Sequence, residues 1–254
     1  MPQTDGAASA ARAARQDLES LLADEPALAA LLPDGYLDRI ERFVALLLEA
    51  NERINLTRVV APAEVARLHL LDALAALPLL DAAGPGPVVD LGSGGGVPAL
   101  PLALARPKRA WVLVDSVAKK AAVLRAIADA LGLGQVTVLA ERAETLGRDP
   151  QHREQYAIAT ARACASLPVL AELAVPLLRP GGTLLAWKGP LGEEDDEVRR
   201  GRAAIGQVGG GPVRLIDSGL PALGGHRFVV VSKDRATAER FPRRPGEPGR
   251  NPLA

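Results

Sequence analysis

The residues best placed to do chemistry lie in a glycine-rich loop that follows a carboxylate. The apolar run V-V-D-L at 88–91 leads into G-S-G-G-G at 92–96, and Pro98 follows. Glycines can take φ > 0 and let a ligand approach the backbone, while Pro98 suits a first helical turn, where a missing amide hydrogen costs nothing. The free amides and the dipole at a helix start favour a carboxylate or phosphate. The stretch therefore predicts a strand, loop and helix that hold a nucleotide-like cofactor.

Two acids distinguish the cofactors that such a loop could bind. Gly94, Gly96 and Ala99 also satisfy the G-x-G-x-x-A form of the dinucleotide fingerprint, which leaves a nicotinamide-dependent oxidoreductase as the alternative. Asp90 would repel a pyrophosphate, whereas the methionine part of S-adenosylmethionine carries an ammonium and a sulfonium that an acid attracts. Asp115 ends the next apolar run, where an acid can meet a ribose diol. These residues favour methyl transfer, with S-adenosylmethionine as the cofactor.

Composition bounds the class of protein. The chain has 254 residues, 48% of them hydrophobic, which is enough for one α/β domain with a modest extension. Its formal net charge is zero and its pI is near 6.9, so no global field draws the protein to a polyanion. Any contact with nucleic acid must then come from local basic patches, such as the stretch from Lys233 to the end.

The cysteine and histidine content argues against a disulfide and a metal site. Cys164 has no partner for an intramolecular disulfide, and His69, His152 and His226 are not spaced as metal ligands. The N-terminal residues contain no apolar run long enough for a secretion signal, and no segment approaches the ~20 apolar residues of a membrane span. We expect a cytoplasmic protein with no metal and no membrane contact.

Three regions follow one another along the chain. Residues 1–83 are predicted to be a helical N-terminal extension. Residues 1 to about 16 are expected to be frayed, and from Asp17 to Leu80 the apolar residues recur at the spacing of helices. Residues 84–234 alternate strands and helices, which implies right-handed βαβ units and a parallel sheet. Residues 235–254 form a basic tail rich in proline and arginine. The expected fold class is α/β: the Rossmann-like sheet of a class I S-adenosylmethionine-dependent methyltransferase with a helical N-terminal extension.

The end of the predicted sheet also favours a methyltransferase. The expected strands cover residues 88–91, 111–115, 136–140, 156–160, 183–188, 213–217 and 227–233, and the expected helices cover 98–105, 117–131, 167–178 and about 193–208. A turn is expected at 179–182. Only a short stretch rich in proline and glycine separates the last two strands, which is typical of a hairpin with an antiparallel last strand. A dinucleotide-binding fold would continue with further crossovers instead.

Several segments together resemble the bacterial family of 16S ribosomal RNA guanine-N7 methyltransferases known as RsmG or GidB. They are N-E-R-I-N-L-T at 51–57, L-H-L-L-D-A-L at 68–74, D-L-G-S-G-G-G-V-P-A-L-P at 90–101, E-R-A-E at 141–144, A-R-A at 161–163, L-L-R-P-G-G-T-L-L-A-W-K-G at 177–189, L-P-A-L-G-G-H-R at 220–227 and F-P-R-R-P-G at 241–246. The resemblance implies S-adenosylmethionine as donor and N7 of one guanosine in 16S ribosomal RNA as acceptor. It also implies the RNA, or a precursor of the small ribosomal subunit, as partner, and we expect a monomer.

The resemblance also implies cofactor contacts. Residue by residue, they fall on Gly92, Val97, Ala143, Glu144 and Arg162. The chain departs from the usual family residue at four positions, with Val97 in place of Phe or Leu, Ala99 in place of Gly, Asp115 in place of Glu and Trp187 in place of Met. These changes concern cofactor affinity more than reaction type.

The predicted reaction needs no general base, because guanine N7 has a lone pair and no proton to lose. Positioning should carry the catalysis, and the candidates are Arg162 and Lys188, at the carboxyl ends of predicted strands, and His69, on an amphipathic helix. Each has a structural alternative: an ion pair for Arg162, a solvated position for Lys188 and packing for His69. The expected RNA contacts are Asn55, Arg58, His69, Lys188, Arg227, Arg243 and Arg244, with Asp72 a weaker substrate-side candidate and the two tail arginines on phosphate.

Two other functions stay open. Cys164 follows the fourth predicted strand and could act as the nucleophile of a cytosine-C5 methyltransferase. It lacks a preceding proline and a second cysteine, which favours a small packed thiol instead. A small-molecule methyltransferase is the other alternative, since only the resemblance and the basic tail point to RNA. A noncatalytic RNA-binding module would not explain Asp90, Asp115 and Glu144 beside a glycine loop.

Overall fold

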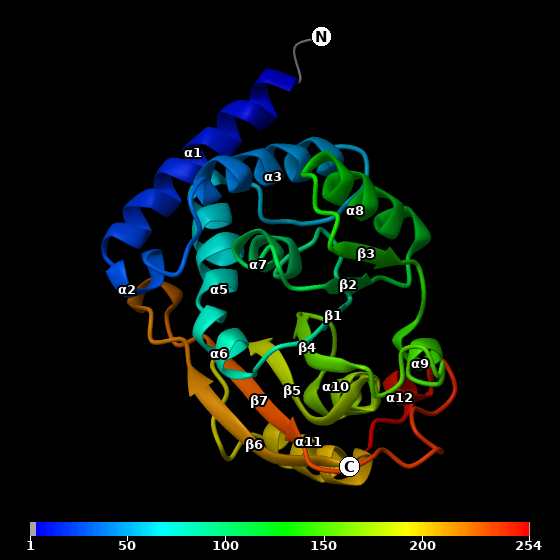
Figure 1. Cartoon of the computed structure of the whole chain (residues 1–254). Helices are drawn as coiled ribbons and strands as arrows, with labels where there is room; N and C mark the ends of the chain where they lie inside the picture. Colours follow the sequence, from blue (N-terminus) through cyan, green and yellow to red (C-terminus); the bar gives the residue numbers. More distant parts are fainter. Residues whose placement is uncertain (1–3, 254) are drawn as a thin grey trace.

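The computed structural model describes residues 4–253 and contains a seven-stranded sheet with helices on both faces (Figure 1). Before the sheet lies the helical extension. Its elements are α1 (Thr4–Ala23), α2 (Pro26–Ala29), α3 (Tyr36–Asn51), α4 (Pro62–Glu64), the π-helical stretch η1 (Val65–Leu71), α5 (Asp72–Leu74) and α6 (Leu77–Ala82). The wider π-helical turn is visible at the end of η1, where the Asp72 amide donates to the carbonyl of Arg67, five residues earlier. Such turns occur often at functional sites.

Helix α1 begins at Thr4, so the prediction that residues up to about 16 are frayed is wrong for residues 4–16. Ala7, Ala11, Ala14, Leu18 and Leu22 are buried at helical spacing on one face of α1, and α1 packs against α3. Alanine contributes little apolar area, but its small side chain lets two helices approach closely. The stripe was missed because it is made mostly of alanine; residues 1–3 lie outside the described residues.

The strands are β1 (Val88–Leu91), β2 (Trp111–Val114), β3 (Val136–Leu139), β4 (Tyr156–Arg162), β5 (Leu178–Lys188), β6 (Gly210–Asp217) and β7 (Arg227–Lys233). They lie in the order β3-β2-β1-β4-β5-β7-β6. The first five are parallel, while β7 lies antiparallel between β5 and β6. The predicted parallel sheet with an antiparallel last strand is therefore confirmed.

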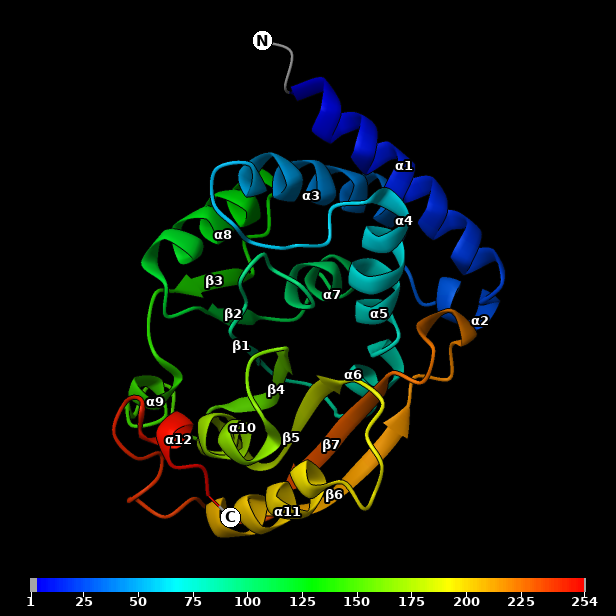
Figure 2. The same cartoon turned by 180° about the vertical axis from the view of Figure 1, so that it is seen from behind.

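Two apolar layers cover the sheet. Helices α7 (Ala99–Ala105) and α8 (Ala118–Ala130) share one face with the N-terminal extension. Helices α10 (Leu167–Ala174) and α11 (Asp196–Val208) cover the other face, and Figure 2 shows them on the side of the sheet away from α7 and α8. Alternate residues of β1 follow this division: Val88 belongs to the first layer and Val89 to the second. The extension is thus part of the main core.

The segment before the fifth strand differs from the prediction. Helix α10 ends at Ala174, and the short 3-10 turn η2 (Val175–Leu177) leads directly into β5 at Leu178. The expected turn at 179–182 is an irregularity within β5, where the register with β4 shifts between Tyr156 and Ile158. Proline and glycine in this segment loosen the ladder without ending the strand.

After β7 the chain folds back along α9 (Ala143–Leu146) and α10, where it forms the short helix α12 (Glu247–Arg250) (Figure 1). Buried Lys233 starts this return, because its Nζ donates to Oε1 of Glu154 at 2.7 Å. The same oxygen accepts the Thr237 amide at 2.8 Å, and Arg153 donates to the carbonyls of Thr237 and Phe241. The basic tail is therefore packed on the sheet domain over residues 235–253.

Candidate active site

The candidate site lies at the carboxyl ends of the parallel strands, beside the point where the chain order changes from β1 to β4. Open α/β sheets bind their ligands at such an edge. Gly92 begins the loop after β1 with φ of 69°, and a Cβ there would lie 2.9 Å from Sγ of Cys164. Glycine is required at this position by both the backbone conformation and the close approach of the β4–α10 loop.

Asp115 holds the glycine loop in place. Its Oδ2 accepts the amide of Gly94 at 2.9 Å, and its Oδ1 accepts the amide of Val117 at 2.8 Å. The sequence predicted Asp115 as a ribose contact; in this structure both carboxylate oxygens hold backbone amides. Val97 of the same loop packs against the apolar layer of α7 and α8.

Asp90 is the most deeply buried acid of the site, with 1% of its surface exposed. Thr160 donates to its Oδ1 at 2.7 Å, while Oδ2 has no hydrogen-bond partner. Burial raises the pKa of Asp90 to about 6, against the opposing effect of the Thr160 hydrogen bond. A buried oxygen without a partner needs an explanation. A cationic ligand at the edge of β1 would supply one.

A cavity of about 430 Å³ opens beside the glycine loop. Of the predicted cofactor contacts, Gly92, Ala143 and Glu144 line it, whereas Asp90, Gly94, Val97, Asp115 and Arg162 do not. The rest of the lining is Leu91, Val114, Ser116, Glu141, Arg142, Cys164, Ala165, Ser166, Val169, Leu173, Gly246, Pro248 and Gly249. The polar and apolar lining beside the glycine loop fits a ligand with a flat ring and a sugar. The partnerless Asp90 oxygen is not part of this lining, but it lies at the end of the strand that leads into the loop and would suit a positive charge there.

Glu144 connects this cavity to the C-terminal tail. Its Oε1 accepts the amide of Gly246 at 2.7 Å and Nη2 of Arg142 at 3.0 Å. Burial alone would raise the pKa of Glu144, but these two donors hold it below its usual range. The tail residues that line the cavity were not predicted to be there, because no local pattern indicates the pairing of Glu144 with Gly246, 102 positions away.

Arg243 anchors the tail segment that reaches the cavity. Its side chain and amide donate to both carboxylate oxygens of Glu172, at 2.6 to 3.0 Å, and Glu172 is fully buried on α10. The predicted phosphate contact by Arg243 therefore meets a competing partner, since the guanidinium faces the protein. Arg244 is exposed and has no side-chain partner among the described residues.

A second cavity, of about 480 Å³, lies next to the first. Its lining comes from the extension and from the ends of β4, β5 and β7: Val59, Leu68, His69, Asp72, Arg162, Ala163, Trp187, Lys188, Gly189 and His226. We refer to it as the basic cavity and to the first as the cofactor cavity. The loop after β4 joins the two, because Arg162 and Ala163 line one and Cys164 to Ser166 line the other.

Arg162 ties the sheet to the extension within the basic cavity. It donates to the Leu68 carbonyl, to Oδ2 of Asp72 at 3.0 Å and to Nδ1 of His69 at 3.0 Å. Since arginine only donates, Nδ1 of His69 is the acceptor, and Nε2 carries the hydrogen that it donates to Thr57 Oγ1 at 2.8 Å. Burial and the Arg162 charge lower the pKa of His69 to about 4. His69 is therefore neutral, with both nitrogens in use.

Lys188 lines the basic cavity and contacts the loop that reaches the cofactor cavity. Its Nζ donates to the Ala165 carbonyl at 2.9 Å and to Oε1 of Glu197 at 2.6 Å. These bonds hold the loop after β4 against the end of β5 and leave Lys188 partly exposed toward the basic cavity. Of the other predicted RNA contacts, Asn55 and Arg58 are exposed before α4, and Arg227 donates to the Leu191 carbonyl.

Comparison with known proteins identifies the family. Residues 36–210 match the family model GidB, described as rRNA small subunit methyltransferase G. The "Ribosomal RNA small subunit methyltransferase G" of Deinococcus deserti is 46% identical over 85% of this chain and 88% of its own length. That of Deinococcus radiodurans is 44% identical over 85% of each chain. The chain belongs to the rRNA small subunit methyltransferase G family.

Solved structures that are more distant in sequence support the fold of this GidB-family protein. The CMeT domain of the citrinin polyketide synthase matches 86% of this chain and 69% of its own, with a TM-score of 0.53 and 17% identity. The S-adenosylmethionine-dependent methyltransferase SibL has the same TM-score and identity over 78% of this chain and 76% of its own. The predicted class I methyltransferase fold is confirmed, and with the family match so is the S-adenosylmethionine-dependent activity.

The environment of Cys164 is consistent with membership of this family, because it does not activate the thiol as a nucleophile. The residue is exposed on the loop after β4, which differs from the expected packed position. The residue is exposed as a whole, but its sulfur lies against Gly92, and desolvation of the sulfur and the nearby carboxylates of Asp90 and Asp115 raise the pKa of the thiol to about 11. A thiol in that state is a poor nucleophile at neutral pH. The environment of Cys164 therefore does not favour cytosine-C5 chemistry.

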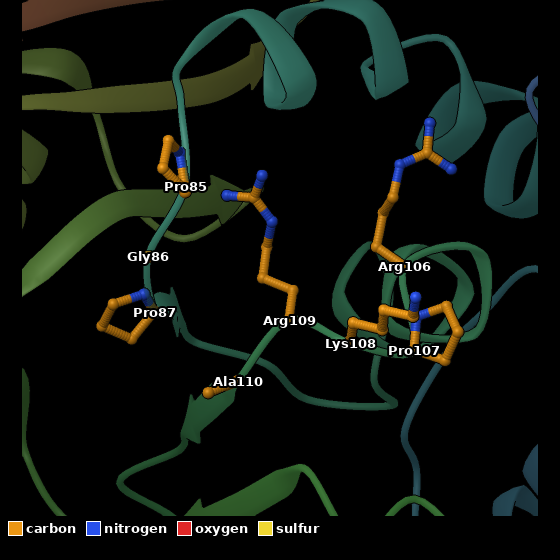
Figure 3. A pocket seen from close by; sticks show the side chains of 8 residues that line it. All are labelled: Pro85, Gly86, Pro87, Arg106, Pro107, Lys108, Arg109 and Ala110. Carbon is orange, nitrogen blue, oxygen red and sulfur yellow. The ribbon is translucent and has the colours of Figure 1, made fainter.

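The opposite edge of the GidB-family sheet carries another cavity, of about 600 Å³ (Figure 3). Pro85, Gly86 and Pro87 line it before β1, and Arg106 to Ala110 line it before β2. These residues lie at the amino ends of the strands, so this cavity is separate from the candidate site. Among the described residues, no helix is long and apolar enough to cross a membrane, and no cluster of three potential ligands could hold a metal.

Proposed function

We propose that this chain transfers the methyl group of S-adenosylmethionine to N7 of one guanosine in 16S ribosomal RNA, acting as a monomer in the cytoplasm. The observation that carries the proposal is the junction of the two cavities at residues 162–166. One cavity fits the cofactor and the other a nucleobase, with Trp187 as an apolar wall and Arg162 and Lys188 as cations.

The residues of the cofactor cavity have distinct roles in this proposal. When bound, S-adenosylmethionine supplies a methyl group on a cationic sulfonium. Asp90 offers the partnerless oxygen to the positive charge of the methionine part, and Glu144 and the Gly246 segment enclose the adenosine part. Asp115 fixes the loop amides that would otherwise be free to move. The tail thus becomes part of the cofactor site.

The basic cavity positions the base rather than activating it. Guanine N7 and O6 are acceptors, and no proton must leave before N7 attacks a methyl group. Consistent with this, His69 is neutral and fully hydrogen-bonded, so it holds Arg162 and Thr57 and does not take up a proton. Arg162 and Lys188 present cations at the mouth of the cavity, where RNA phosphate or O6 can bind.

The test is methyl transfer from labelled S-adenosylmethionine to 16S ribosomal RNA and to small subunits from cells that lack this protein, with nuclease digestion of the product. We expect label in 7-methylguanosine at one site, and comparison of free RNA with subunits identifies the preferred substrate. Label in 5-methylcytidine would contradict the proposal and move the reaction to Cys164. Cofactor binding without transfer to RNA or subunits would also contradict it, in favour of a small-molecule substrate.

A further inference from the structure

The carboxylate of Asp72 connects the basic cavity to a histidine that the sequence did not single out. Asp72 is 4% exposed, and its two oxygens have different partners. Oδ2 accepts from Arg162 at 3.0 Å, while Oδ1 lies 3.1 Å from Nδ1 of His226. The Asp72 carbonyl accepts the indole hydrogen of Trp187 at 2.8 Å. Asp72 is thereby fixed by β4 and β5, and it fixes the ring of His226 in turn.

This contact determines which nitrogen of the neutral His226 ring carries the hydrogen. A carboxylate that accepts from arginine can only accept from the histidine as well, so in the neutral ring Nδ1 holds the hydrogen and Nε2 has a free lone pair. The side chain of His226 is 32% exposed and lines the basic cavity. Nε2 has no partner among the described residues.

His226 therefore supplies a kind of group that the other side chains of the cavity do not. Arg162 and Lys188 only donate, both nitrogens of His69 are bonded, and the two oxygens of buried Asp72 already face Arg162 and His226. Among the described side chains that line the cavity, Nε2 of His226 is the free hydrogen-bond acceptor. A ligand of this cavity should then offer a donor as well as the acceptors that the cations bind.

Guanine has this combination. Its N7 and O6 are acceptors, and its N1–H and exocyclic amine are donors on the opposite edge of the purine. Adenine has a lone pair at N1, which would face the lone pair of Nε2. A base with N7 toward the cofactor cavity would turn its N1 edge away from that cavity. We propose that His226 selects guanine by accepting the N1–H hydrogen, and that Asp72 acts as the positioning residue that fixes the His226 ring.

This inference rests on the proposed function and adds a part to its transition state. As N7 attacks, its lone pair forms the bond to the methyl carbon while the carbon–sulfur bond breaks and leaves its pair on sulfur. The purine gains the positive charge, which makes N1–H a stronger donor, and no proton leaves the base. The bond to His226, backed by the Asp72 carboxylate, strengthens as this charge develops, so it contributes to rate as well as to binding.

The experiment combines two enzymes with two RNAs. Wild type and His226→Ala are compared on RNA with guanosine at the target position and on RNA with 2,6-diaminopurine riboside there. The second base keeps N7 and the 2-amine, has a lone pair at N1 and carries an amine in place of O6. The change at O6 is common to both enzymes, so the comparison between the two enzymes on each RNA isolates the contact at N1. For His226→Ala we expect kcat/KM to fall roughly 10- to 100-fold on the guanosine RNA and to stay within about twofold on the diaminopurine RNA. His226→Gln, which keeps an acceptor, should restore part of the guanosine rate.

Two controls separate the possible failures. S-adenosylhomocysteine affinity, measured by calorimetry, should be unchanged in His226→Ala, which shows that the fold and the cofactor cavity are intact. If wild type forms 7-methylguanosine but the kcat/KM of His226→Ala falls equally on both RNAs, or on neither, the assignment of His226 is overturned and the proposed function stands. If wild type forms no 7-methylguanosine, the proposed function itself fails.

Discussion

At the scale of single residues, burial shifts the two most perturbed groups of the site in opposite directions. The pKa of Asp90 rises to about 6 and that of His69 falls to about 4, with desolvation the largest cause for each. The neutral histidine is a structural link between Arg162 and Thr57. Asp90 is different, because its second carboxylate oxygen has no hydrogen-bond partner.

Asp90 gives a pH-dependent prediction. Because its folded pKa lies above the unfolded value of 3.8, its contribution to stability is present below pH 3.8 and is lost as pH rises through about 6. Asp90→Asn should therefore be more stable than wild type at pH 7.5 by about 3 kcal/mol, and the difference should become small near pH 4. Urea unfolding across this pH range measures it. The same variant should bind S-adenosylmethionine more weakly, since the opposite charge is gone.

Asp129→Asn is the matched control, because Asp129 is an exposed acid on α8. It shows how much of the stability difference comes from loss of a charge alone. If saturating cofactor does not reduce the stability advantage of Asp90→Asn over wild type, the assignment of Asp90 to the cofactor's positive charge is wrong.

The sequence predicted residue types at the site better than their partners. Gly92 and Glu144 line the cofactor cavity as expected, Gly92 because a glycine loop follows the first strand and Glu144 because the family resemblance implied it. The partners of Arg162 lie 90 to 94 positions away, and the Glu172 that binds Arg243 lies 71 positions away. No local pattern indicates such pairs. His226 was missed for the same reason, since the Asp72 carboxylate that it contacts lies 154 positions earlier.

At the scale of elements, the least expected feature is the C-terminal tail as a wall of the cofactor cavity. Strand and helix periods predicted the sheet well, because each βαβ unit is specified over a short stretch of chain. The tail has few apolar residues and reads as solvated. Its place depends on buried ionic contacts, those of Lys233 with Glu154 and of Arg243 with Glu172, which periodicity does not report. Helix α1 was missed in its first turns because alanine gives a weak apolar pattern.

The two neighbouring arginines of the tail should therefore behave differently. Arg243→Ala leaves the fully buried Glu172 without its partner, which should lower the free energy of unfolding by about 3 kcal/mol. It should also release the Gly246 segment, so we expect the Kd for S-adenosylhomocysteine to rise at least about 10-fold. Arg244→Ala, the exposed neighbour, should change neither quantity.

Thermal unfolding and calorimetry of the two variants measure these effects. The double variant Arg243→Met with Glu172→Gln removes the buried charge while keeping most of the volume. The double variant should recover the free energy of unfolding but not the affinity for S-adenosylhomocysteine. This result would show that the loss of affinity comes from the displaced tail and not from a less stable fold. Equal cofactor affinity in wild type and Arg243→Ala would show that the tail contributes no binding energy.

At the scale of the whole molecule, zero net charge means that RNA binding depends on where cations lie and not on how many there are. Most arginines of the structure are engaged with acids or carbonyls of the same chain. Arg58, near the basic cavity, and Arg244, near the cofactor cavity, are exposed and have no side-chain partners among the described residues. They are the cations best placed to release counterions when RNA phosphates reach the candidate site.

The salt dependence of RNA binding tests this local model against a global one. Arg58→Ala, Arg244→Ala and Arg42→Ala each change the net charge by the same amount, but Arg42 is exposed on α3 and lines neither cavity. If only net charge mattered, the three variants would bind RNA alike. If position matters, Arg58→Ala and Arg244→Ala should each reduce the slope of log Kd against log salt concentration by about 0.7 to 0.9, and Arg42→Ala should leave it unchanged. Titration of small-subunit RNA at several salt concentrations gives the slopes. Equal slopes for all three variants would contradict the local model. They would mean that Arg58 and Arg244 contact RNA phosphates no more than the distant Arg42 does, so that other groups of this neutral protein hold the RNA.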